Sequence, residues 1–472
     1  MQHAVVVRSI DAADEDFTDL EPLMDAIGSA QVVQLGEPSH GAGGSFAAKV
    51  RLIKFLHQRM GFDLLAWESG MHGLRVAQAG LRAEDDEVTA AQRGIFTIWS
   101  NTEELKPLFE YVKAAQSSTR PLEMAGFDLQ FTARQAVERF SADLRTFVSR
   151  VRDHAVRSRS QELAEQALAA YQRICCARRE ARSRKQAELA AAGMTGKALE
   201  EALAAWDNND GPRLQPTPEH LDALNNATDG LLRSIAAHRS LFEQVHGPRE
   251  ASFMEHAIEN MRSDGASQAD VVQGAGGSVA ATFRNMSMSF NRRDAQNARN
   301  LRWLIEKGYP GRKMIVWAHN VHIINAYFEA GFRDIHLEPQ PGGMKPTGVY
   351  VAEWFGDKVY TIGVTTYAGL DGWATSTVST QLPSVAPDSL EARLHALGKP
   401  YLFVDFRALD ATPDHPLRSP HAMRILVPAP GSSTRPPGQG NYTITDISRA
   451  FDALFYIDQM TPATRIGETR RE

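Results

Sequence analysis

Short apolar runs alternate with longer stretches in which apolar residues recur every three or four positions. The short runs are typical of buried strands, and the 3.6-residue period is typical of helices. The pattern predicts helices over 46–60, 74–81 and 102–115, and strands over 4–7, 31–35, 62–67, 122–126, 313–318, 360–366 and 401–406. Residues 424–427 and 454–457 are expected to add strands at the sheet's edges. This alternation predicts an α/β fold with a mainly parallel sheet flanked by helices.

The pattern changes between residues 133 and 262, where Ala, Glu, Arg, Gln and Leu dominate. An amphipathic helical stripe runs through Leu163, Ala167, Ala170, Ile174 and Ala177. We therefore expect a helical subdomain at 133–262, inserted between two parts of an α/β core at 1–132 and 263–472. The glycine-rich stretch 264–277 is expected to be a mobile loop, because no clear strand precedes it and no Gly-Lys-Ser/Thr sequence ends it.

Composition narrows the class of protein. The chain has 472 residues, and 51 basic against 57 acidic side chains give a net charge of −6, which argues against nucleic acid as the main partner. No apolar run approaches the roughly 20 residues of a membrane helix. The two cysteines, Cys175 and Cys176, are adjacent, and neighbouring cysteines rarely form an unstrained disulfide. Because no secretory signal is visible either, we expect a cytoplasmic protein.

Polar residues of chemical interest follow the predicted strands where each strand ends. Glu37 and His40 follow the strand 31–35, Glu68 and Asp128 follow the next two, and His319 and His322 follow the strand 313–318. Parallel strands point the same way, so these side chains should converge on one edge of the sheet, where α/β proteins bind ligands. The sequence therefore predicts a cleft lined by carboxylates and histidines.

Such a group of side chains could activate a water molecule. His40 or His319 would accept the proton, while Glu37 or Glu68 would orient the imidazole. Lys49, Arg51 or Arg293 could neutralise an oxyanion on an attacked carbonyl. No Gly-x-Ser-x-Gly sequence is present, and both cysteines lie in the helical insertion. Attack by water is therefore favoured over an acyl-enzyme.

Two alternatives remain open from the residues alone. Glu37 with His40, and His319 with His322, could supply ligands to zinc or iron in a metal-dependent hydrolase. The cations expected nearby at Lys49 and Arg51 would oppose a metal ion. The chain could also be a non-catalytic protein that binds a small molecule, although such a pocket has no need for so many titratable groups.

Several of these stretches together resemble the erythromycin esterase family. The resemblance begins at Leu35-Gly-Glu-Pro-Ser-His-Gly41 and spans nearly the whole chain except the helical insertion. Its other parts are Lys49-x-Arg51, Gly61-Phe62, Glu68, Gly126-Phe-Asp128, Arg293-Asp294 with Ala298 and Asn300, Trp317-Ala-His-Asn-Val-His322, Thr361-Ile-Gly363 and Phe451-Asp-Ala-Leu454.

The resemblance implies an α/β core with a helical subdomain, and hydrolysis of a macrolide lactone ester without a metal or other cofactor. By motif, His40 would be the general base, Glu37 and Glu68 its supporting carboxylates, and His319 the second active-site histidine. Substrate binding is expected of Lys49, Arg51, Asp128, Arg293 and His322. The expected partner is a small-molecule ester.

Overall fold

The structure is a computed structural model. It describes residues 4–83, 86–133, 135–175, 177–209, 217–274, 279–326, 344–375, 379–411, 415, 421–424, 442–444 and 447–468. The chain divides into two compact units, one made of residues 1–136 and 294–472 and the other of residues 137–293.

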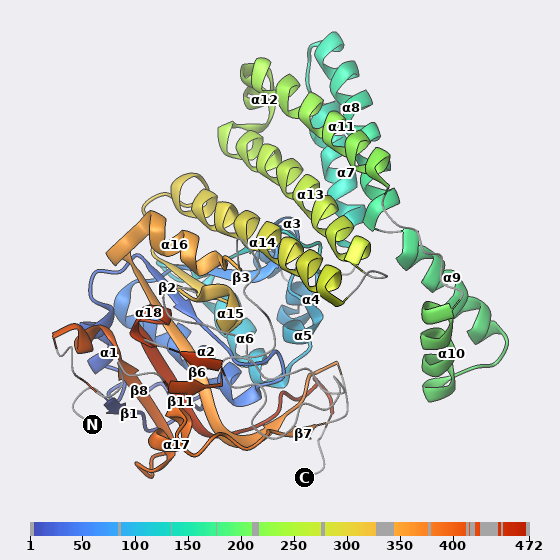
Figure 1. Cartoon of the computed structure of the whole chain (residues 1–472). Coiled ribbons are helices and arrows are strands. Elements are labelled where there is room, and N and C mark those ends of the chain that lie inside the picture. The colour runs from blue at the N-terminus through green and yellow to red at the C-terminus, as the bar shows by residue number, and fades with distance from the viewer. Residues whose placement is uncertain are drawn as a thin grey trace. The chain divides into compact units, whose positions relative to one another are not determined.

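The first unit is built on a nine-stranded sheet in the order β1-β8-β11-β6-β2-β5-β3-β4, with β7 paired to β6 (Figure 1). Its strands are β1 Ala4–Val6, β2 Val32–Leu35, β3 Leu64–Gly70, β4 Glu123–Asp128, β5 Met314–Trp317, β6 Val359–Asp371, β7 Thr380–Gln381, β8 Tyr401–Asp405 and β11 Ala453–Met460. All neighbours from β11 to β4 are parallel, whereas β8 runs antiparallel to both β11 and β1. The predicted α/β class with a mainly parallel sheet is confirmed.

Helices cover both faces of the sheet because alternate strand residues point to opposite faces. Val33, Leu65 and Ile315 pack in one core cluster, and Val32, Leu64 and Met314 in the other. The first cluster includes residues of α1 Pro22–Ile27, α2 Gly43–Met60, α3 Met71–Arg82, α4 Glu87–Gln92, α5 Thr97–Ser100 and α6 Lys106–Ala115. The second includes residues of α15 Asn320–Ile323, α16 Thr347–Phe355, α17 Leu390–His395, α18 Ile447–Ala450 and the end of α14 Val279–Trp303.

Two predictions about the sheet's edges come out differently. Residues 454–457 were expected at an edge but belong to β11, which lies inside the sheet between β8 and β6. Their near-complete burial explains the continuous apolar run, which does not by itself tell an edge from a centre. Residues 425–427 of the other predicted edge strand lie outside the described residues. The separate pair β9 His421–Met423 and β10 Tyr442–Ile444 is antiparallel.

The second unit is helical. It contains α7 Ala136–Ser149, α8 His154–Cys175, α9 Ala177–Ala191, α10 Gly196–Asn209, α11 Pro218–Ala237, α12 Arg239–His246 and α13 Pro248–Gly274, and α14 begins within it. The unit ends at Arg293, beyond the residue 262 expected from composition.

The predicted loop at 264–277 is wrong over Asp264–Gly274, which continues α13. Its one internal glycine, Gly265, is needed for packing, because a Cβ there would lie 2.5 Å from the Leu224 side chain. A close helix contact therefore explains this glycine better than a loop does. Residues 275–278 lie outside the described residues.

Two further observations concern membrane-spanning helices and the two cysteines. No helix among the described residues is both long and apolar enough to cross a membrane. Cys175 is disulfide-bonded in the structure, and Cys176 lies outside the described residues. The prediction of no disulfide is therefore wrong for Cys175, and the argument from cysteines for a reducing compartment loses its support.

Candidate active site

Four strand ends bring the predicted residues together at one edge of the sheet. The neighbouring strands β2, β5, β3 and β4 present, in that order, Glu37, His319, Glu68 and Asp128. All four residues are at most 3% exposed. His319 therefore comes from the strand between those that supply the two glutamates. The convergence expected from parallel strands is found in the structure.

Glu37 is the centre of the first group of contacts. One of its oxygens, Oε1, lies 2.8 Å from Nδ1 of His40 and accepts a hydrogen bond of 3.1 Å from the Trp99 indole N–H. The other, Oε2, accepts a hydrogen bond of 2.8 Å from the Lys49 ammonium. An ionised carboxylate can only accept, so Nδ1 of His40 carries a proton. In the neutral ring, Nε2 of His40 is then the basic nitrogen.

Lys49 is enclosed on several sides. Its ammonium lies 3.7 Å from the centroid of the Trp317 ring and donates to the Ala318 carbonyl at 3.3 Å. Burial lowers the pKa of Lys49 to about 8, although the charge of Glu37 and, more weakly, that of Glu68 favour the protonated form. The cation is thus fixed against Glu37 and its proton is held less firmly than that of an exposed lysine.

Glu68 and His319 form the second group of contacts. The Glu68 Oε2 atom accepts the backbone N–H of His319 at 2.8 Å. His319 is the N-cap of α15, and its Nδ1 accepts the backbone N–H of Val321 at 3.1 Å. Burial, reinforced by the charge of His40, holds the pKa of His319 well below its ordinary value. The carboxylate of Glu68 therefore positions His319 through its backbone N–H. Burial keeps the imidazole ring neutral.

His322 lies between two carboxylates. Its Nδ1 is 2.9 Å from Oδ1 of Asp294, and its Nε2 is 3.4 Å from Oε1 of Glu68. Asp294 also accepts the backbone N–H and the hydroxyl of Thr347, at 2.8 and 2.9 Å. With an acid group on each side, the ring links Glu68 to α14 and α16. The contacts of His322 are those of a residue that supports Glu68.

Asn320 fixes the loops after β2 and β5 against one another. Its backbone N–H donates to the Glu37 carbonyl at 2.9 Å, and its side-chain amide forms two hydrogen bonds with the backbone of Val364 on β6. A Cβ at Gly36 would lie 2.1 Å from the Asn320 amide oxygen. The glycine of the Gly-Glu sequence is therefore needed for this close approach.

His40 is the more open member of the group. Its side chain is 23% exposed, and its ring lies 5.2 Å from those of Trp99 and His319 and 5.6 Å from that of Trp373, measured between centroids. Trp373 is brought close because Gly41 has no side chain, since a Cβ there would lie 2.5 Å from the indole. The basic nitrogen of His40 thus lies within a ring of aromatic side chains.

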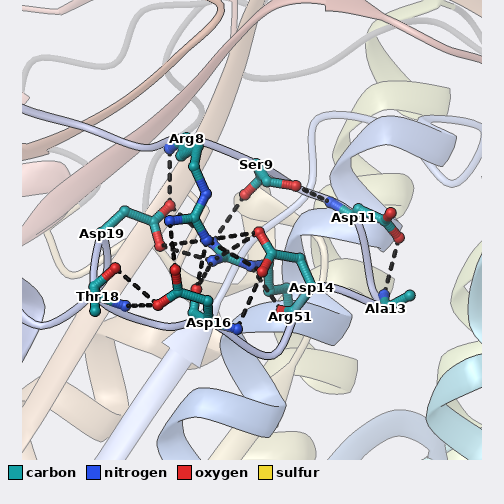
Figure 2. A network of polar contacts seen from close by, with 9 residues as sticks. All are labelled: Arg8, Ser9, Asp11, Ala13, Asp14, Asp16, Thr18, Asp19 and Arg51. Atoms are coloured by element: carbon teal, nitrogen blue, oxygen red, sulfur yellow. Dashed lines mark hydrogen bonds and ion pairs between the residues drawn. The ribbon is translucent and has the colours of Figure 1, made fainter.

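Arg51 points into the segment that follows β1, where it lies among polar groups of Ser9, Asp14, Asp16 and Asp19 (Figure 2). It is 1% exposed, and all five of its N–H groups are used. Two bind the Asp19 carboxylate at 2.6 and 3.0 Å, and the others bind the carbonyls of Ser9, Asp14 and Asp16. No N–H remains for a substrate, so we assign Arg51 a structural role in place of the predicted substrate contact.

The structure places the remaining predicted residues less directly. Asp128 is buried, and its Oδ1 accepts the backbone N–H of Gln130 at 3.1 Å. Arg293 is partly exposed and is the last residue of the helical unit. Substrate contacts by Asp128 and Arg293 stay predictions.

Several residues of the site were not predicted as such. Asp294 was named only as part of the family resemblance, and Trp99 and Trp373 were not singled out. Asp294 could have been found from the sequence, because it and Asn297 are three residues apart and so lie on the same face of α14. The amide oxygen of Asn297 accepts the backbone N–H of Leu129. Periodic polar positions on an otherwise buried helix indicate such inward contacts.

The metal-dependent alternative finds little support in the donor groups. Among the His, Cys, Asp and Glu side chains that the structure describes, no group of three or more could hold a metal ion. Glu37, one of the expected ligands, is already bonded to a lysine ammonium.

Solved structures share the fold. A Bacillus cereus protein of known crystal structure matches with a TM-score of 0.71 at 17% identity, over 98% of this chain and 97% of that one. A crystallised succinoglycan biosynthesis protein gives a TM-score of 0.63 at 18% identity, over 98% and 96%. A mutant of the erythromycin esterase EreC, in its open conformation, gives 0.59 at 17% identity, over 99% and 100%.

Sequence relatives add to this. "Putative hydrolase YbfO" of Bacillus subtilis (strain 168) is 26% identical over 419 residues, which is 84% of this chain and 79% of that protein. Erythromycin esterase type II of Escherichia coli is 31% identical over 109 residues, 22% of this chain and 25% of that protein. The family model for erythromycin esterase matches residues 57–460. The family and these relatives indicate a hydrolase, and the chain belongs to the erythromycin esterase family.

Proposed function

We propose that this protein is an esterase that opens the lactone ring of a macrolide-like antibiotic by attack of a water molecule activated by His40. The observation that carries the proposal is the Glu37–His40 pair. The buried carboxylate binds Nδ1 at 2.8 Å and leaves Nε2 as the base of a side chain that is 23% exposed. Family membership supports the choice of a lactone ester.

The reaction follows from these contacts. Nε2 of His40 takes a proton from water as the oxygen attacks the ester carbonyl, and the Glu37 carboxylate stabilises the imidazolium that forms. Collapse of the tetrahedral intermediate breaks the bond to the alcohol oxygen, which receives the proton from His40. The products are a carboxylic acid and an alcohol in one ring-opened molecule. Lys49 and Trp99 hold the Glu37 carboxylate in place through their hydrogen bonds to its two oxygens.

The test is a panel of macrolides of different ring size, incubated with purified protein and analysed by mass spectrometry for addition of one water. We expect ring opening of at least one macrolide and a loss of about 10²–10⁴-fold in kcat/KM for His40→Asn, the usual contribution of a general base. His395→Asn is the matched control, because His395 also pairs with a carboxylate, Asp458 at 2.6 Å, on an exposed surface.

Protein that has been treated with a chelator to remove metal ions should keep its activity. Mass spectra of the intact protein during turnover should show no acyl adduct. Hydrolysis by His40→Asn at the rate of the unmodified protein, or a failure to open any macrolide, would overturn the proposal.

A further inference from the structure

The two ring nitrogens of His319 differ in their hydrogen bonding. Nδ1 accepts the backbone N–H of Val321 at 3.1 Å, which requires its lone pair. In a neutral imidazole the single proton must then be on Nε2. Cap geometry thus sets the tautomer of His319 as firmly as Glu37 sets that of His40, but in the opposite sense.

The Nε2–H group of His319 has no hydrogen-bond partner among the residues that the structure describes. The residue is 3% exposed, and Nε2 itself is buried. The backbone carbonyl of Pro38 raises the pKa of the ring less than the neighbouring charges change it, and it does not meet the geometry of a hydrogen bond to Nε2. A buried donor left unsatisfied costs about 1–3 kcal/mol, and such groups in native proteins are rare. A donor kept in this state is suited to an acceptor that arrives with a ligand.

The position of this donor relates it to the base. The rings of His319 and His40 lie 5.2 Å apart at an interplanar angle of 72° and come from the neighbouring strands β5 and β2. A carbonyl carbon attacked by water at His40 would present its oxygen a few ångströms from that water. The two rings are therefore spaced so that one can act on the attacking water and the other on the oxygen of the carbonyl that this water attacks.

The charges around His319 favour a neutral ring. His40 and His322 face it from the loop after β2 and from α15, and both disfavour a second positive charge. Glu68, from β3, favours protonation but interacts with the backbone N–H of His319 rather than with its ring nitrogens. Neither ring nitrogen of His319 offers a free lone pair, so it is poorly suited to be the base.

We infer that His319 is a catalytic residue that donates its Nε2–H, as a neutral imidazole, to the oxygen of the attacked ester carbonyl. The inference rests on the proposed function and adds a second role to it. As water adds, the carbonyl oxygen gains negative charge and the hydrogen bond from Nε2–H strengthens. The proton stays on His319, and the oxyanion re-forms the carbonyl double bond as the alcohol oxygen leaves with the bonding electron pair and takes the proton from His40.

The first experiment needs no substrate. Two-dimensional ¹H–¹⁵N spectra of the histidine rings distinguish the two tautomers, and His319→Gln identifies the resonance of His319. We expect the Nε2–H tautomer at neutral pH and no titration at pH values near 6.5. An Nδ1–H tautomer, or a ring that gains a proton near pH 6.5, would overturn the inference and leave the His40 mechanism untouched.

The second experiment uses the macrolide that the protein opens fastest. His319→Leu removes the donor and should lower kcat by about 10²–10³-fold, the usual cost of one oxyanion donor, with little change in KM. His319→Gln offers an amide N–H and should recover part of the loss. In both variants the pH dependence of kcat/KM should match that of the unmodified protein.

His395→Leu is the control outside the site and should leave kcat unchanged. Full turnover by His319→Leu would refute the donor role while the proposed function stands. A changed pH dependence of kcat/KM in His319→Leu would instead make His319 the base. If no ester is opened by the unmodified protein, the proposed function fails and the donor role fails with it.

Discussion

Lys49 and Arg51 are two residues apart on α2, and both are buried cations bound to a carboxylate. Residues two apart lie on different faces of a helix, so each side chain enters a different network. Lys49 binds Glu37, whose other oxygen orients His40. Arg51 binds Asp19 and three backbone carbonyls of the N-terminal segment (Figure 2).

The difference lies in what the carboxylate does next. Asp19 uses its Oδ2 to accept the backbone N–H of Arg8 and so completes a network that holds the segment before β2. Glu37 binds Lys49 with one oxygen and, with the other, the partly exposed His40. Burial and ion pairing therefore do not separate the cation of the candidate site, Lys49, from a structural one. What separates the two is the other partner of each carboxylate, which is His40 for Glu37 and the backbone N–H of Arg8 for Asp19.

The largest expected effect comes from Lys49→Met, which keeps the length of the side chain and removes its charge. Glu37 would lose its cation and His40 its fixed partner, so kcat/KM should fall by about 10²–10⁴-fold, the contribution of a general base. An unpaired buried carboxylate should also cost about 3–5 kcal/mol of unfolding free energy. Macrolide hydrolysis and urea unfolding measure the two effects. Turnover near that of the unmodified protein would remove Lys49 from the mechanism.

Arg51→Met should lower the stability of the fold by a similar amount but leave the activity unchanged. Removal of the guanidinium takes two hydrogen bonds from the Asp19 carboxylate and one from each of three carbonyls, and the expected loss is about 3–5 kcal/mol of unfolding free energy. At a temperature where the variant is folded, kcat/KM should be unchanged. Arg51→Lys is the matched control and should lose less, because one ammonium can keep the charge but not five hydrogen bonds. A fall in kcat/KM without loss of stability would place Arg51 in the site.

The third prediction concerns pH. Burial lowers the pKa of Lys49 to about 8 from 10.5. Above pH 8 the Glu37 carboxylate loses its cation, so activity should fall by about tenfold per pH unit if the uncharged form is inactive. Glu37, Glu68 and the Trp317 ring are the groups that face the ammonium.

The stability contribution of Lys49 should move in the opposite direction. Between pH 8 and 10.5 the unfolded chain binds the lysine proton and the folded protein does not, so this term of the unfolding free energy rises with pH. Lys49→Arg does not titrate in this range and should abolish both trends. Comparison of Lys49→Met with the unmodified protein isolates the stability term even if arginine fits poorly. An alkaline limb that persists in Lys49→Arg would assign it to another group.

The sequence predicts the fold well where the physics is local. Apolar runs that end in polar residues mark β2, β3 and β5, and parallel pairing then brings Glu37, Glu68 and His319 together without further information. The same reasoning fails for Arg51, since a helical position gives a direction but not the partner that waits there. The partners Asp14 and Asp19 come from an irregular segment between β1 and α1.

The remaining failures have related causes. The helix at Asp264–Gly274 was missed because glycine was interpreted as a loop signal, whereas Gly265 serves a close contact with Leu224. Trp99 and Trp373 contact the site through loops and short helices whose paths depend on tertiary packing. The supporting contacts of His322 with Asp294 join residues 28 positions apart, and only the folded chain shows that pairing.

The smallest effect is expected at Trp99, the third partner of Glu37. Its indole N–H donates to Oε1 at 3.1 Å, and its ring packs with those of Trp67 and Trp317. Trp99→Phe keeps an aromatic ring and removes the donor. Glu37 would retain Lys49 and His40, so we expect kcat/KM to fall by about tenfold, near the lower end of the roughly 1.5–3 kcal/mol of a hydrogen bond to a charged group. Trp67→Phe is the control, because its buried indole N–H has no hydrogen-bond partner in the described part of the chain and it lies in the same aromatic cluster. If Trp99→Phe and Lys49→Met lower kcat/KM equally, the position of Glu37 depends on all three partners together, and the cation has no special part in distinguishing the site from the Arg51 network.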